Sequence, residues 1–87
     1  MGVAVCRNIT TLRGLEPPAT PDEVEAAARQ YVRKVSGVQS VSAATSEAFE
    51  RAVREVTAAT AALLASLPPR KQPPTTEPPL RRIARRA

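Results

Sequence analysis

The chain has 87 residues, a formal net charge of +5, no histidine and a single cysteine. A structural zinc site needs several Cys or His ligands, and a disulfide within the chain needs two cysteines, so both are excluded. No apolar run reaches the roughly 20 residues of a membrane-spanning helix. We therefore predict a protein without metal, cofactor or transmembrane segment, and the lack of a secretion signal predicts a cytoplasmic location.

The hydrophobic core must be small and aliphatic. A chain of this length buries only about 60% of the surface that it exposes when unfolded, and its only aromatic residues are Tyr31 and Phe49. A monomer would be marginally stable, which favours self-association or a protein partner.

The first helix is predicted over 21–36, after a lead-in that has no clear period. Thr20 is a hydroxyl N-cap, Pro21 stands at the first helical position, and Glu23 has capping-box spacing from Thr20. Gly37 provides a C-terminal stop. Between them runs an apolar stripe at helical spacing: Val24, Ala27, Ala28, Tyr31, Val32 and Val35.

The second helix is predicted over 47–67. Ser42 and Thr45 are both suitable N-caps, and the sequence does not choose between them. Pro68 and Pro69 end the helix. Its apolar stripe again has helical spacing: Phe49, Ala52, Val53, Val56, Thr60, Leu63 and Leu67.

Two such helices joined by a short connection predict an all-α fold, an antiparallel helical hairpin. The two stripes alone form a narrow core. The lead-in residues Ile9, Leu12 and Leu15 are therefore expected to pack across the hairpin as a third layer.

The charge excess lies in the C-terminal part of the chain. Residues 1–67 carry seven basic and seven acidic side chains, whereas residues 68–87 carry six basic side chains against Glu77 alone. The second part opens with "PPRKQPPTTEPPL", which holds six prolines and no period, as in extended, solvated segments. Its end, "LRRIARRA", has a basic amphipathic pattern too short to form a stable helix alone. We predict a small helical domain over 1–67 and a disordered, Pro-rich basic tail over 68–87.

Two long stretches, "CRNITTLRGLEPPATPDEVEAAARQYVRKVSG" and "EAFERAVREVTAATAALLASL", resemble a bacterial family known as domain of unknown function 2277. Its members typically begin Met-Cys-Arg-Asn-Ile, continue through a Glu-Pro-Pro-Ala-Thr segment, and carry an Ala-Phe-Glu-Arg-Ala-Val second helix. The resemblance covers about residues 6–67, which leaves the basic tail outside it. It implies no activity, because the family has none assigned.

The chain departs from the family pattern at two places. The family connection usually holds a Pro-Ser pair and an asparagine where this chain has Val41-Ser42 and Thr45. In the family, cysteine follows the initiator directly, whereas "MGVAV" precedes Cys6 here. Because bacteria can initiate at valine codons, we hypothesise that the native start is position 5, read as methionine.

Cys6-Arg7-Asn8 is the candidate reactive cluster. A neighbouring arginine favours the thiolate form of a cysteine, so one alternative is a thiol-dependent redox or nucleophilic role. The chain has no histidine to activate the thiol. The simpler interpretation is a small apolar residue at the start of the lead-in, and we expect no catalysis.

The tail is the other candidate site, for weak nonspecific binding of nucleic acid or an anionic membrane surface. The alternative is a solvated end that aids solubility. Its basic residues are Arg70, Lys71, Arg81, Arg82, Arg85 and Arg86.

A phosphate-binding patch is a further alternative, formed by Arg29, Arg33, Lys34, Arg51 and Arg54. Most of these, though not Lys34, have acidic neighbours at helical spacing, so a solvated, internally paired face is expected instead. A helix-turn-helix is disfavoured, because the connection after Gly37 exceeds the usual 3–4-residue turn. The sequence thus favours a noncatalytic interaction module, with a protein partner or a second copy of the chain.

Overall fold

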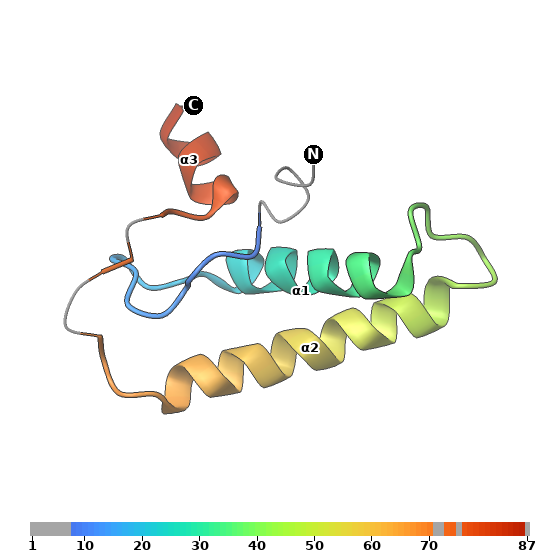
Figure 1. Ribbon diagram of the computed structural model, residues 1–87, viewed down its shortest axis with the longest axis horizontal. Helices are drawn as coiled ribbons and strands as arrows, with labels where there is room; N and C mark the ends of the chain where they lie inside the picture. Colours follow the sequence, from blue (N-terminus) through green and yellow to red (C-terminus); the bar gives the residue numbers. More distant parts are fainter. Residues whose placement is uncertain (1–7, 71–72, 75, 87) are drawn as a thin grey trace.

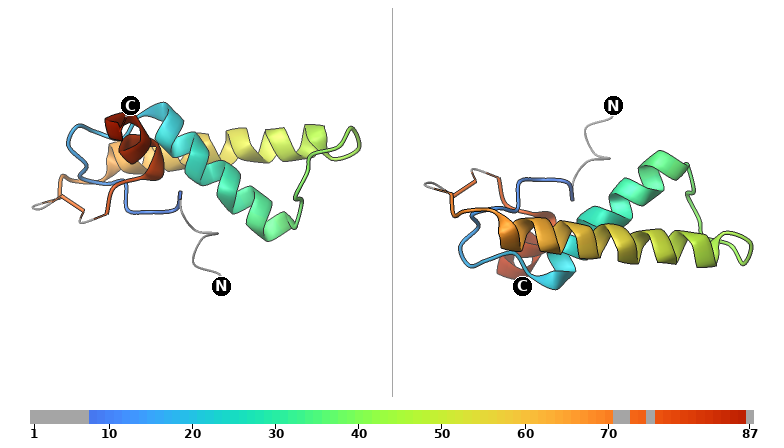
Figure 2. Two further views of the ribbon diagram at one scale, coloured as in Figure 1. Left: turned by 90° about the horizontal axis from the view of Figure 1, so that it is seen from above. Right: turned by 90° about the horizontal axis from the view of Figure 1, so that it is seen from below.

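The computed structural model describes residues 8–70, 73–74 and 76–86, and within them the chain is helical without a strand. It contains α1 (Pro21–Ser36), α2 (Ser46–Ser66) and α3 (Pro79–Arg86). α1 and α2 run antiparallel and cross at an angle, and the lead-in folds back over the end where α1 begins and α2 ends (Figures 1 and 2). The predicted all-α hairpin is confirmed.

The start of α1 is closed by the predicted capping box. The Glu23 backbone N–H donates to Thr20 Oγ1 at 3.1 Å, and the Thr20 N–H donates to Glu23 Oε1 at 2.8 Å. Pro21 opens the helix. At the other end Gly37 adopts a φ of 74° and its N–H donates to the Arg33 carbonyl at 3.0 Å. Both ends therefore lie where local chemistry places them.

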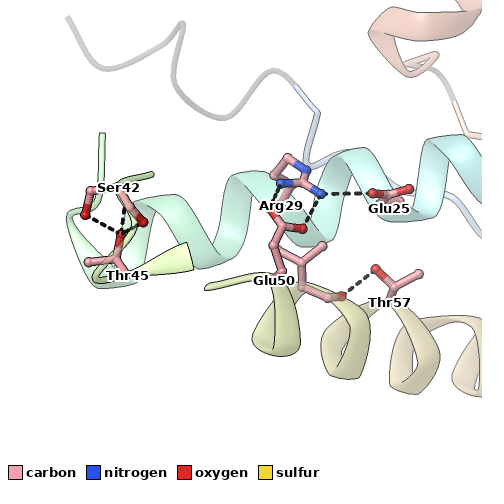
Figure 3. Close-up of polar contacts among 7 residues, drawn as sticks. Glu25, Arg29, Ser42, Thr45, Glu50 and Thr57 are labelled. Atoms are coloured by element: carbon pink, nitrogen blue, oxygen red, sulfur yellow. Dashed lines mark hydrogen bonds and ion pairs between the residues drawn. The ribbon is translucent and has the colours of Figure 1, made fainter. Parts of the chain in front are cut away.

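The start of α2 uses both of the N-cap candidates, in different ways. Thr45 occupies the N-cap position but makes no side-chain capping bond. Its Oγ1 instead accepts from the Ser42 N–H at 3.0 Å (Figure 3). The Ser46 N–H donates to the Ser42 carbonyl at 2.8 Å. The two residues together build the turn that leads into the helix.

The core consists of two small clusters of buried side chains. One joins the helices to each other: Ala28, Val32, Phe49 and Val53. The other joins the lead-in to the first turn of α1: Leu12, Leu15 and Val24. Leu12 and Leu15 thus form the predicted third layer, whereas Ile9 is 43% exposed.

The buried side of α2 turns away from the predicted stripe in its C-terminal half. Leu63 and Leu67 are 55% and 38% exposed, and Leu64 packs against the second cluster instead. Neighbouring residues on a helix differ by about 100° in direction. The lead-in residues Leu12 and Leu15 pack against the side on which Leu64 lies, so Leu64 is partly buried and Leu63 is exposed.

The lead-in is also tied to the chain that follows α2. The Arg13 guanidinium donates from Nε and Nη2 to the Pro68 carbonyl, at 2.9 and 2.6 Å. One residue on, Gly14 has a φ of 88°, and a Cβ added there would lie 3.0 Å from the Cβ of Arg70. This close approach needs a residue without a side chain.

We expect Gly14→Ala to destabilise the chain more than Gly37→Ala. Both positions have a positive φ, which costs an alanine about 1–2 kcal/mol. At Gly37 nothing lies within 4 Å of the added methyl, whereas at Gly14 it would meet Arg70. Overpacking should add about 1 kcal/mol to the loss at Gly14, measured by urea unfolding. Equal losses would show that the lead-in does not lie against Arg70.

Candidate functional site

An apolar groove of about 320 Å³ opens between the lead-in, α1 and α2. Tyr31 and Ile9 lie at its rim, where their exposed fractions are 49% and 43%. The groove is lined by Ile9, Thr10, Leu12, Ala27, Ala28, Tyr31, Val56, Thr60 and Leu64. No charged side chain is among them.

A backbone hydrogen bond positions the lead-in at the edge of this groove. The Asn8 N–H donates to Oε1 of Gln30 at 2.7 Å. Because Ile9 follows Asn8 and Tyr31 follows Gln30, the bond holds these two large side chains at the same rim. The exposed apolar pair is therefore fixed by the fold.

The α2 wall of the groove continues into an uncharged helix surface. Leu63, 55% exposed, follows Thr60 by three residues and Val56 by seven, so all three lie on one side of the helix. From Val56 to Ser66 the helix has no charged residue. We call the surface formed by Ile9, Tyr31, Val56, Thr60 and Leu63 the groove face.

Arg29 joins the two long helices through a polar cluster at a different part of the surface (Figure 3). Its Nη1 and Nη2 donate to the two Glu50 carboxylate oxygens at 2.9 and 3.0 Å, and Nη2 also reaches Glu25 at 3.0 Å. The guanidinium carbons of Arg29 and Arg33 each lie 5.8 Å from the Phe49 ring centroid. Arg29 is thus committed to internal pairs rather than open to a phosphate, as the sequence analysis expects for the domain's arginines.

The ionisation of this cluster follows from its hydrogen bonds. The bond from Arg29, and its positive charge, hold the pKa of the Glu50 carboxyl below its ordinary value. The Glu50 and Glu25 carboxylates in turn raise the pKa of Arg29. Each partner therefore favours the charged form of the other.

Arg81 is a predicted site residue, but the sequence does not predict its contact with α1. Its Nε and Nη2 donate to Glu23 Oε2 and Oε1 at 3.1 and 3.0 Å, and Nη2 also reaches the Pro18 carbonyl at 3.2 Å. The side chains of Arg81 and Glu23 are only 12% and 4% exposed. We call this contact the Arg81 clasp.

The Arg81 clasp attaches α3, a helix within the segment 68–87, to α1. α3 lies beside the first turn of α1, on the side away from α2 (Figure 1), and Pro78 and Pro79 at its start are buried. A helix of eight residues does not persist in water alone. The contact between Arg81 and Glu23 stabilises α3 in the folded chain.

Of the other predicted site residues in the tail, Arg70 is the one whose side chain the structure describes. Arg70 is exposed, and its aliphatic part lies against Gly14. Cys6, Arg7, the hypothetical start at position 5, and Lys71 lie outside the described residues, as do the side chains of Arg82, Arg85 and Arg86. The thiol and nucleic-acid roles stay predictions.

The family model for "Uncharacterized conserved protein (DUF2277)" matches residues 5–87. The chain belongs to this family. The match includes the tail, so the expectation that the tail lies outside the family segment is wrong: the residues of α3 fall within the matched segment. No curated protein and no solved structure matches the chain.

Two further features of this DUF2277 chain bear on its chemistry. Among the described residues, no group of three or more Cys, Asp or Glu side chains is placed to hold a metal ion. Within the same residues, no helix is long and apolar enough to cross a membrane.

We expect Glu50→Gln to lower the free energy of unfolding at neutral pH. Because the pKa of Glu50 is depressed in the folded chain, its stabilisation is present above the pKa of the unfolded carboxyl and is lost as the pH falls through the folded value. The difference between wild type and E50Q in urea unfolding should therefore narrow between about pH 5 and about pH 3.

The control for this measurement is Glu47→Gln. Glu47 is 90% exposed and lies 3.7 Å from Arg51, so its removal should change stability by at most about 0.5 kcal/mol at any pH. If the difference in unfolding free energy between wild type and E50Q did not change with pH, the pairing of Glu50 with Arg29 would be contradicted.

Proposed function

We propose that this DUF2277 chain is a noncatalytic interaction module, and that its partner is a second copy bound through the groove face. The observation that carries the proposal is the open apolar groove with Ile9 and Tyr31 held half-exposed at its rim. Contiguous exposed apolar surface of this kind is typical of interaction sites.

The size of the core supports the need for a partner. The described residues include seven buried hydrophobic side chains, of which only Phe49 is aromatic. A chain with so little buried apolar surface gains stability from covering the groove face as well. Association would extend the core across the interface.

The charge pattern favours a second copy over an unrelated partner. In a two-fold dimer the same surface patch meets itself, so a charge near the axis faces its own copy. α2 carries no charge from Val56 to Ser66, and this half of the helix can therefore meet its own equivalent without repulsion. The last turn of α1, which carries Arg33 and Lys34, lacks this property.

We expect Leu63→Gln to raise the dissociation constant of the dimer at least about tenfold. The exposed leucine is lost twice in a symmetric contact, and glutamine keeps the helix propensity of α2. Sedimentation of the full chain over a range of concentrations measures the constant. Wild type should show a concentration-dependent equilibrium between monomer and dimer.

The matched control is Val41→Gln, which changes a 38% exposed aliphatic residue of the connection. It should leave the dissociation constant unchanged. A folded wild-type monomer at every concentration would overturn the dimer, and equal effects of the two substitutions would show that the interface lies elsewhere.

A further inference from the structure

The orientation of α3 differs from that of an ordinary amphipathic helix on a protein surface. Such a helix turns its apolar side toward the core and its charges toward water. α3 instead buries the guanidinium of Arg81 against Glu23, while Leu80 and Ile83 are 39% and 60% exposed. Besides the buried Pro79 at its start, the helix is attached through Arg81, and it presents Leu80 and Ile83 to the outside.

The charge around these aliphatic residues identifies the partner. From Thr76 to the end of the sequence the chain has four arginines and one acidic residue, Glu77. Arginines on a short helix with exposed aliphatic side chains match a surface that is negatively charged at its face and apolar beneath. We infer that α3 docks the folded chain onto an anionic lipid surface, with Leu80 and Ile83 entering the headgroup boundary and arginines attracting the charged lipids.

The exposed aliphatic side chains favour lipid over nucleic acid for the same helix. The phosphate backbone of a nucleic acid is bound by basic and polar groups. It offers no apolar surface that would cover the exposed side chains of Leu80 and Ile83. Only 12% of the Arg81 side chain is exposed, so this arginine is unavailable to an external phosphate of either partner.

The Arg81 clasp gives this surface two further properties. It holds the eight-residue helix α3 folded before contact, which reduces the ordering cost that a short free peptide meets on binding. It also connects the membrane contact to the start of α1, so that binding would hold the hairpin, and not only a tail, at the surface. This inference does not depend on the dimer proposed above.

Binding of the full chain to lipid vesicles tests the inference. Vesicles of phosphatidylcholine with phosphatidylserine should bind the chain, and vesicles of phosphatidylcholine alone should bind it far more weakly. The double substitution Leu80→Gln and Ile83→Gln should weaken binding at least about tenfold, whereas Val35→Gln, at a 65% exposed aliphatic residue of α1, should not weaken it. Glutamine preserves helix propensity in each case.

A second variant keeps the test independent of α3 folding. Replacement of Arg82, Arg85 and Arg86 by glutamine should weaken binding to the charged vesicles about a hundredfold. The inference is overturned if the charged vesicles do not bind, if Val35→Gln weakens binding as much as the Leu80 and Ile83 change, or if the arginine variant binds like wild type. It is also overturned if random duplex DNA binds more tightly than the vesicles and the Leu80 and Ile83 change affects neither.

Discussion

The described structure depends most on one buried carboxylate, that of Glu23. Oε1 accepts hydrogen bonds from the Thr20 N–H and from Arg81 Nη2, and Oε2 accepts from Arg81 Nε. With 4% of the side chain exposed, the charge requires these partners, because an unpaired buried carboxylate is strongly destabilising. The same group therefore starts α1, fixes the end of the lead-in, and attaches α3 to the hairpin.

Because the hydrophobic core is small, hydrogen bonds from three arginines also connect the segments of the chain. Arg13 ties the lead-in to the Pro68 carbonyl, Arg29 ties α1 to α2 through Glu50, and Arg81 ties α3 to Glu23. Each guanidinium presents two donors to one partner, which fixes direction as well as distance. With the segments connected in this way, apolar side chains remain exposed at the groove face and on the outside of α3. We assign these two surfaces to partners.

The features that the sequence predicts well are those that local chemistry decides. The Thr20–Glu23 capping box and the Gly37 stop involve residues close in sequence, and α1 lies where they place it. The partial burial of Leu64 instead of Leu63 depends on the lead-in. The pairing of Glu50 with Arg29 of the other helix, instead of with Arg54 of its own helix, depends on how the helices cross. These outcomes come from packing between segments, which periodicity along one helix does not contain.

The C-terminal helix shows the same limit, since Arg81 and Glu23 are 58 residues apart. Hydrogen exchange of backbone amides in the full chain tests their role most directly. Glu23→Gln keeps a capping-box acceptor but loses the charge, so Thr20 should stay protected while the α3 amides exchange faster. Glu23→Ala should speed exchange at the Thr20 amide and at the α3 amides, and the Val53 amide should stay protected in all three chains. If the α3 amides exchange at one rate in all three chains, the carboxylate does not hold the helix and the account fails.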